Sequence, residues 1–194
     1  IIMRKPFMVE FTGTPEAGKT TSIRNVANKL LNEGYTVAIL EESAERLPEE
    51  IPKGTWDANL WMHYQTQAGI LRATYLEANV VLIDRGLIDS NFYGRKFLWE
   101  NVCSEEQYQN FRKQFMYELL PDFLVALVVQ PQIAIQRRGG AGRLVNEEYV
   151  RAYNKLFMRY YDEIECQKAL IDTAELDVYQ MNEAIFQTIK SRLP

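Results

Sequence analysis

Residues 13–20 combine the residue types that proteins use to bind phosphate. They match the pattern G-x-x-x-x-G-K-[ST] at every fixed position, between an apolar run at 7–12 and a helical segment at 21–33 that Gly34 closes. Such glycines let successive N–H groups point at phosphate oxygens, while the lysine reaches the β and γ phosphates and the threonine hydroxyl binds Mg²⁺. We therefore expect ATP and Mg²⁺ here, held by Gly13, Glu16, Ala17, Gly18, Lys19, Thr20 and Thr21.

A second group of functional side chains is expected where the third apolar run ends, at Asp84-Arg85. Open α/β sheets bind ligands at the carboxyl ends of their strands. Asp84, with Thr20, is placed to order the water shell of Mg²⁺, and Arg85 brings a permanent fork of donors to the phosphates. The alternative interpretation of the pair is a salt bridge at the end of a strand.

An acidic pair, Glu41-Glu42, follows the second apolar run. In a doubly wound sheet this position lies beside the phosphate loop, where a carboxylate can accept the proton of an acceptor hydroxyl or order Mg²⁺. Either residue could be the base, and we favour Glu42.

Two further segments could complete the site. Residues 137–143 hold three arginines and three glycines, a poor helix but a good hinge, so the sequence predicts a mobile arginine-bearing lid at about 137–147. On the expected helix 57–78, Trp61, Gln65, Gly69 and Arg72 share one face. There a Gln amide could read a base edge and the small residues could leave room for a flat ring.

The elements that must position these residues alternate between strand and helix patterns. Five apolar runs, at 7–12, 36–40, 80–84, 123–129 and 169–172, predict buried parallel strands covered on both faces. The predicted fold is α/β, a three-layer α/β/α arrangement with a five-stranded parallel sheet in a single domain over residues 1–194.

Three apolar stripes at helical spacing are interpreted as core. They are Leu60, Tyr64, Ala68, Leu71 and Tyr75; Val150, Tyr153, Phe157, Tyr161 and Ile164; and Tyr108, Phe111, Phe115 and Leu119. The third stripe could instead form a helix-to-helix interface in a homodimer.

Composition narrows the range of partners. The chain of 194 residues has 22 basic and 26 acidic side chains, a net charge of −4, and no basic block, so a nucleic acid polymer is not an expected partner. No apolar run is long enough for a membrane span, and no export signal is recognised at the start.

Cys103 and Cys166 form no metal or disulfide pattern, which favours a cytoplasmic location. The single histidine, His63, is expected at the surface or the edge of a pocket.

Together these segments resemble the deoxynucleoside kinase family of P-loop kinases, with thymidylate kinases as near relatives. The resemblance rests on residues 13–20, Glu42 with Arg46, Tyr64-Gln65-Thr66 through Arg72, Asp84-Arg85, and the arginines before Glu148-Tyr149. It implies that Glu42 is the base, that Gln65 bonds the nucleobase with Trp61 and Arg72 nearby, and that Arg85 lies near the acceptor hydroxyl. It also implies that Arg137 and the loop at Asp172 contact the donor adenine, that Arg143 clamps the transferring phosphoryl group, and that the chain forms a homodimer.

The chain departs from the family pattern at three places, one of which is a lid that is shorter and richer in glycine. Gly86 stands where nucleoside kinases commonly carry serine, and the Arg-Glu-Pro-Gly stretch of thymidylate kinases is replaced by residues 41–44. The leading hypothesis is ATP and Mg²⁺ dependent phosphorylation of the 5′-hydroxyl of a nucleoside, with a deoxynucleoside as the first choice. The alternatives are a nucleoside monophosphate kinase of the thymidylate kinase type and a nucleotide-binding regulatory ATPase.

Overall fold

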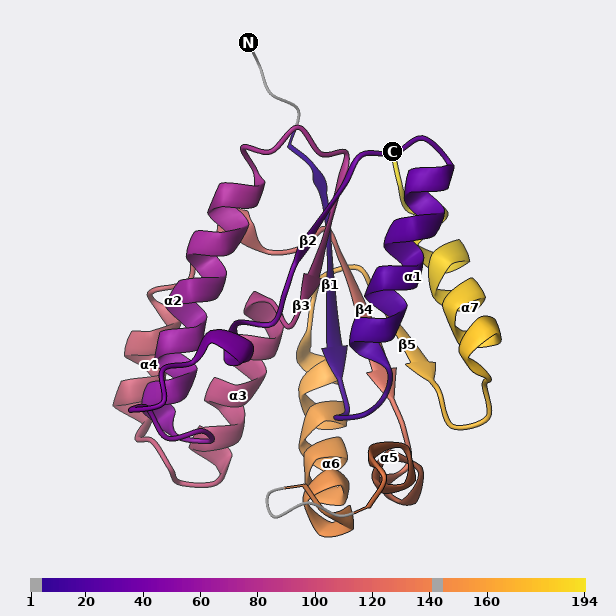
Figure 1. The fold of residues 1–194 in the computed structure, drawn as a ribbon. Helices are drawn as coiled ribbons and strands as arrows, with labels where there is room; N and C mark the ends of the chain where they lie inside the picture. Colours follow the sequence, from indigo (N-terminus) through magenta and orange to yellow (C-terminus); the bar gives the residue numbers. More distant parts are fainter. Residues whose placement is uncertain (1–4, 141–144) are drawn as a thin grey trace.

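A five-stranded, all-parallel sheet forms the centre of the molecule, with the strand order β2-β3-β1-β4-β5 (Figure 1). The structure, a computed structural model, describes residues 5–140 and 145–194. The strands are β1 Phe7–Gly13, β2 Val37–Leu40, β3 Val80–Asp84, β4 Phe123–Val128 and β5 Lys168–Asp172. These bounds agree with the predicted runs to within a residue or two at each end.

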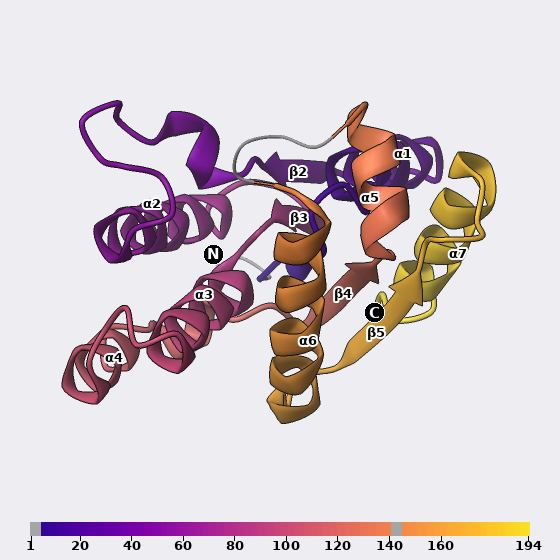
Figure 2. The same cartoon turned by 90° about the horizontal axis from the view of Figure 1, so that it is seen from below.

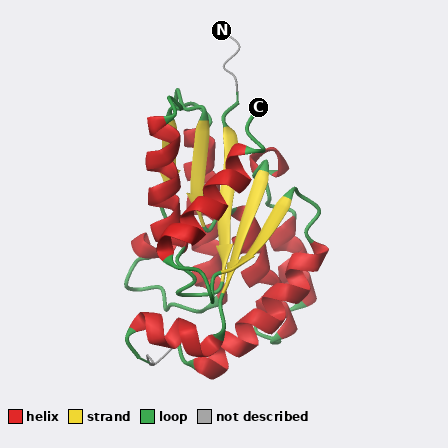
Figure 3. Ribbon diagram, turned by 90° about the vertical axis from the view of Figure 1, so that its right-hand side faces the viewer, coloured by secondary structure: helices red, strands yellow, loops and turns green. Residues whose placement is uncertain are grey.

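Helices connect the strands and cover both faces of the sheet. They are α1 Lys19–Asn32, α2 Trp56–Ala73, α3 Leu87–Trp99, α4 Glu105–Arg112, α5 Pro131–Arg138, α6 Glu147–Glu163 and α7 Val178–Lys190, with short 3₁₀ turns η1 Ser43–Arg46 and η2 Tyr117–Leu119. Seen along the sheet, α1 and α7 lie on one side and α2, α3 and α6 on the other (Figure 2). The strands lie between these two helical layers (Figure 3), so the predicted α/β/α architecture is confirmed.

Successive side chains of β1 point to opposite faces of the sheet and pack against different helices. Val9 and Phe11 pack toward α1 and α7, whereas Met8 packs toward α2 and α3, and all three are fully buried. Central strands of a parallel sheet are apolar on both faces for this reason. The edge strands differ, because β2 and β5 are only partly buried. The expectation that all five strands are covered on both faces is therefore wrong at the two edges, where one neighbouring strand is missing.

Two of the three predicted stripes lie in the core. Val150, Tyr153 and Phe157 of α6 are fully buried, as predicted. Tyr108 and Phe111 are each 1% exposed and pack against Phe97 of α3. The third stripe is therefore used inside the protomer, which removes the observation that favoured it as a dimer interface.

The stripe predicted for α2 is wrong. Tyr64, Leu71 and Tyr75 are 48%, 40% and 67% exposed, and α2 ends at Ala73. The buried face of the helix instead carries Ala58, Asn59, His63, Thr66, Gln67, Ile70 and Ala73. Apolar residues occur on several faces of α2, so its pattern could be fitted with more than one stripe.

The helices of the described ranges, 5–140 and 145–194, include none with both the length and the apolar character of a membrane span. Cys103 and Cys166 are both free thiols.

Candidate active site

The phosphate loop joins β1 to α1 through a backbone that needs glycine. Gly13 and Gly18 have φ angles of 117° and 92°, and Glu16 between them has a φ of 61°. A Cβ atom at Gly13 would lie 2.0 Å from the carbonyl oxygen of Leu127 in β4. The loop is therefore packed against the neighbouring strand at a distance that only glycine allows.

Lys19 is folded back onto this loop. Its Nζ donates to the carbonyl oxygens of Gly13 at 3.1 Å and Thr14 at 2.8 Å, and the side chain is almost fully buried. Burial, with the nearby positive charge of Arg85, lowers the pKa of Lys19 to about 7. An anion placed among the loop N–H groups would offer the ammonium a better partner than these neutral carbonyls.

Thr20 and Asp84 supply oxygen ligands that suit Mg²⁺. The Thr20 hydroxyl donates to Asp84 Oδ2 at 2.7 Å, and Asp84 Oδ1 is buried with no hydrogen-bond partner in the described part of the chain. No cluster of three His, Cys, Asp or Glu side chains able to hold a metal occurs within residues 5–140 and 145–194. One carboxylate and one hydroxyl fit Mg²⁺ that takes its remaining ligands from phosphates and water, as is usual for this ion.

Arg85 occupies the centre of an ion-pair network. Its Nε lies 3.1 Å from Glu42 Oε1 without the alignment of a hydrogen bond, and its Nη1 donates to both oxygens of Asp89 at 3.1 and 3.3 Å. Arg85 has a φ of 57°, a conformation that costs a non-glycine residue energy. Burial raises the pKa of Glu42, and the charge of Arg85 opposes this shift.

The start of α3, which carries this network, is anchored to β1. Asp89 accepts a short hydrogen bond from the Thr12 hydroxyl. Glu10, fully buried in β1, accepts from the backbone N–H groups of Ile88 at 3.1 Å and Asp89 at 2.7 Å. The Glu10 side chain thereby caps the N-terminus of α3 by accepting from two of its first backbone N–H groups.

Two hollows meet at Glu42 and Arg85. The first, about 270 Å³, lies over the phosphate loop and includes Lys19 and Thr20. The second, about 630 Å³, opens beside it between η1, α2 and α3, and Pro15, Glu42 and Arg85 line both. Acidic and basic groups therefore stand at the junction between a phosphate site and a cavity large enough for a small organic molecule.

The second cavity, here called the acceptor cavity, has a mainly apolar wall with polar groups at chosen places. Its remaining lining residues are Ser43, Ala44, Leu47, Lys53, Gly54, Thr55, Asn59, Met62, Thr66, Gly86, Asp89, Ser90, Tyr93, Phe97, Arg138, Val145 and Tyr149. Glu41 is exposed and absent from both linings, so the geometry favours Glu42 over Glu41 as the candidate base.

The polar face predicted on α2 is not brought to the site. Gln65 and Arg72 are exposed, Trp61 is half-buried, and none of the three lines the acceptor cavity. A Cβ atom at Gly69 would lie 2.8 Å from Leu40 Cδ1, so the small residue there accommodates β2 and not a flat ring. The face of α2 that reaches the cavity is the one with Asn59, Met62 and Thr66, about one residue further round the helix.

The residues expected to contact the donor adenine lie together near the ends of β4 and β5. Arg137 donates to the Thr173 hydroxyl at 2.9 Å and to the Thr173 carbonyl at 2.6 Å, next to the exposed Asp172. Arg138 lies 4.0 Å from Glu16 of the phosphate loop.

Both arginines belong to the last turn of α5, which Gly139 ends with a φ of 83°, so the segment expected to be a poor helix is helical at its first two residues. Arg143 lies outside the described residues, and the lid stays a prediction.

His63 is fully buried, which makes the expected surface position wrong. Its imidazole packs against the rings of Phe111 and Phe115, with centroids 4.7 and 4.4 Å away.

Of the residues that sequence reasoning missed, Asp89 had a signal, because it stands four positions after Arg85, the spacing of an ion pair on a helix. No pattern in the sequence marked Ser90 or Asn59 as residues of the cavity wall.

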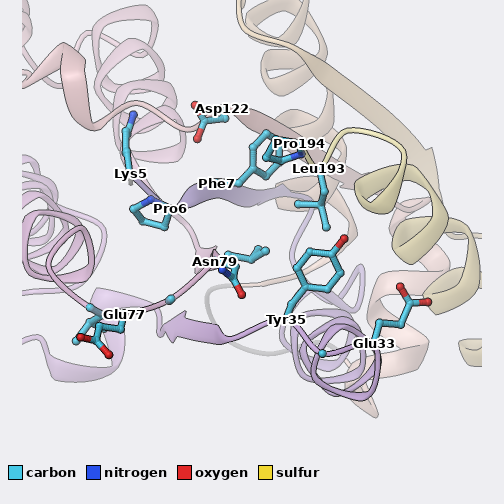
Figure 4. Close-up of a pocket in the computed structure, with 14 residues that line it drawn as sticks. Lys5, Pro6, Phe7, Glu33, Tyr35, Glu77, Asn79, Asp122, Leu193 and Pro194 are labelled. Carbon is cyan, nitrogen blue, oxygen red and sulfur yellow. The ribbon is translucent and has the colours of Figure 1, made fainter. Parts of the chain in front are cut away.

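A larger hollow, of about 1010 Å³, lies at the opposite end of the sheet (Figure 4). It is formed by the start of β1, the end of α1 and the C-terminal residues, with Lys5, Tyr35, Asn79 and Asp122 on its wall. It contains no part of the phosphate loop and lies at the amino ends of the strands, away from the edge where open parallel sheets bind ligands. The site described above is therefore the better candidate despite its smaller volume.

The fold and this site define a P-loop protein of the nucleoside and nucleotide kinase type. A family described as an AAA domain matches residues 8–176, and the chain belongs to that family.

Known proteins agree with this architecture. Thymidylate kinase of Caldanaerobacter subterraneus subsp. tengcongensis is 28% identical over 166 residues, 76% of each chain, and that of Thermoanaerobacter sp. is 26% identical over 160 residues, 73% of this chain and 75% of the other. Deoxyadenosine kinase from M. mycoides, in a structure with products dCMP and a flexible dCDP bound, superposes with a TM-score of 0.74 at 24% identity, covering 95% of this chain and 99% of that one. The same enzyme with bound dATP gives a TM-score of 0.73. The predicted resemblance and the P-loop kinase fold are thus confirmed.

Proposed function

We propose that the chain transfers the γ-phosphoryl group of ATP to the 5′-hydroxyl of a nucleoside, with a deoxynucleoside as the first candidate. The observation that carries this proposal is the position of Glu42 and Arg85 on the wall shared by the phosphate-loop hollow and the acceptor cavity. A hydroxyl entering from the cavity would meet a carboxylate and a guanidinium where it faces the donor phosphates. The kinase names of the matched proteins support the same class of reaction.

In this account Glu42 accepts the 5′-hydroxyl proton as the oxygen attacks the γ-phosphorus. The bond from that phosphorus to the β–γ bridging oxygen breaks, giving a nucleoside 5′-monophosphate and ADP. Burial raises the pKa of Glu42, which makes the carboxylate a stronger base than one in water. Lys19 and Arg85 would balance the charge spread over the phosphoryl oxygens in the transition state.

Thr20 and Asp84 would hold Mg²⁺, which neutralises phosphate charge when it is bound. Arg137, Thr173 and Asp172 would form the edge of the donor base site, and Arg143 would act on the phosphoryl group from the lid. A cytoplasmic location and a homodimer are further expectations from the sequence and the family resemblance.

A nucleoside monophosphate acceptor is the second candidate. Lys53 and Arg138 line the acceptor cavity and could pair with an acceptor phosphate, and the matched thymidylate kinases carry the name of that reaction.

The test incubates the protein with ATP, Mg²⁺ and a panel of nucleosides and their monophosphates, and reads the products by mass, with Lys19→Ala as control. A Lys19-dependent nucleoside monophosphate supports the proposal, and a diphosphate made from a monophosphate supports the second candidate. ATP loss with no acceptor consumed would point to a regulatory ATPase and reject both.

A further inference from the structure

A chain of hydrogen bonds leads from the acceptor cavity into the core. Ser90, on the cavity wall, has its Oγ 3.1 Å from Nδ1 of His63. The other ring nitrogen of His63, Nε2, lies 3.0 Å from Nε2 of Gln67, and Gln67 Oε1 accepts from the backbone N–H of Met116 at 2.7 Å. This relay of hydrogen bonds begins at Ser90 on the cavity wall and ends at the backbone N–H of Met116, which can only donate.

The direction of every bond in this relay follows from its buried end. A backbone N–H only donates, so the atom of Gln67 that faces Met116 must be the amide oxygen. The amide nitrogen of Gln67 therefore faces His63 and donates to it. Nε2 of His63 must then be the unprotonated nitrogen, which puts the ring proton on Nδ1, and Nδ1–H donates to the Ser90 oxygen.

At neutral pH the His63 ring is uncharged and carries a proton on only one of its two nitrogens. Its complete burial lowers the pKa of His63 to about 4, although the nearby Gln114 carbonyl opposes the shift. A proton on Nε2 directed at Gln114 would leave two donors, from His63 and Gln67, facing each other at 3.0 Å. The tautomer protonated at Nδ1 avoids this conflict.

The consequence appears at Ser90. Its oxygen already accepts from His63, and within residues 5–140 and 145–194 this is the one hydrogen bond that its side chain makes. The hydroxyl proton is thus left for a partner in the cavity. Asn59, one turn before His63 on α2 and 2% exposed, also lines the cavity, and its amide nitrogen has no hydrogen-bond partner among the described residues.

We infer that His63 is a positioning residue that fixes the Ser90 hydroxyl as a hydrogen-bond donor toward the acceptor substrate, so that the cavity selects nucleosides whose base presents a ring carbonyl oxygen. The inference rests on the proposed function for the identity of the substrate, and on the hydrogen-bond geometry for the direction of the relay. It gives Ser90, Asn59 and His63 the specificity role that sequence reasoning assigned to Gln65.

The first experiment needs no activity. His63 is the only histidine of the chain, so the ¹⁵N signals of its imidazole in the untagged, labelled protein are unambiguous. We expect a neutral ring protonated at Nδ1 at pH 7. A ring protonated at Nε2, or at both nitrogens, would overturn the relay whether or not the protein is a kinase.

The second experiment measures dissociation constants for two nucleosides that differ only in one ring carbonyl. Ser90→Ala should weaken binding of the carbonyl-bearing nucleoside about tenfold more than binding of its partner, the effect of one hydrogen bond. His63→Asn, which keeps a donor near the position of Nδ1, should retain most of the discrimination that His63→Leu loses. Equal weakening of both nucleosides by Ser90→Ala would show a packing role and reject the inference, whereas failure of phosphoryl transfer with discrimination intact would reject only the proposed function.

Discussion

The carboxyl group of Glu10 occupies the space that a side chain at Gly86 would need. A Cβ atom at Gly86 would lie 2.4 Å from Glu10 Oε2, although the glycine has an ordinary negative φ of −93°. A buried acid beneath the start of α3 makes any side chain there too large.

Replacing Gly86 with alanine should destabilise the protein by about 2–4 kcal/mol, because the start of α3 must move away from β1. Gly34→Ala is the matched control. No atom of the residues that the structure describes lies within 4 Å of its Cβ position beyond its chain neighbours, so only its φ of 89° opposes the change, at about 1 kcal/mol. Urea unfolding of both variants gives the comparison, and an equal loss in the two would contradict the steric argument.

The same buried acid makes stability depend on pH. Burial raises the pKa of Glu10 to about 8, against the backbone hydrogen bonds from Asp89, Ile88 and Gly86 that lower it. The folded state therefore holds a proton between about pH 4.5 and 8 that the unfolded state has lost, and stability must fall as pH rises through this window.

Glu10→Gln removes this titration, so the free energy of unfolding of the wild type relative to the variant should decrease from pH 5 to pH 8. The lowered pKa of His63 has the opposite effect, because it makes stability rise with pH between about pH 4 and 6.5. Both proteins contain His63, so this contribution cancels in the difference. A difference that stays constant with pH would show that Glu10 is ionised in the folded protein.

Glu42→Gln should lower turnover about 100-fold or more if this carboxylate takes the acceptor proton. Glu41→Gln, one position earlier and exposed, should change it little. Because the base works when ionised and its pKa is raised, wild-type turnover should fall as pH drops through that pKa. Steady-state rates of the three proteins across pH test this, and wild-type turnover in Glu42→Gln would remove the residue from the mechanism.

Asp89→Asn should reduce turnover about tenfold, because Arg85 would lose the charged partner that fixes its guanidinium. Asp57→Asn, an exposed change in the first turn of α2, controls for the loss of one negative charge. If Arg85 is held mainly by Glu42, the two variants will show the same rate.

Residues at the ends of strands could be predicted from the sequence. Lys19, Glu42 and Asp84-Arg85 each follow an apolar run, and parallel topology brings such ends to one edge. Gln65 could not be placed, because neighbouring helical positions differ by about 100° in direction and the apolar residues of α2 did not mark its buried face. The contact between His63 and Ser90 depends on how α2 packs against α3, which local patterns do not encode.

The proposed function requires the site to move a phosphoryl group from ATP onto a nucleoside hydroxyl. The most direct measurement uses ATP with ¹⁸O in its γ-phosphoryl oxygens and follows the label by mass in the presence of Mg²⁺ and nucleosides. We expect the labelled phosphoryl group on the 5′-oxygen of a nucleoside with the wild type and not with Lys19→Ala. Label found only in free phosphate, with every nucleoside unchanged, would contradict it.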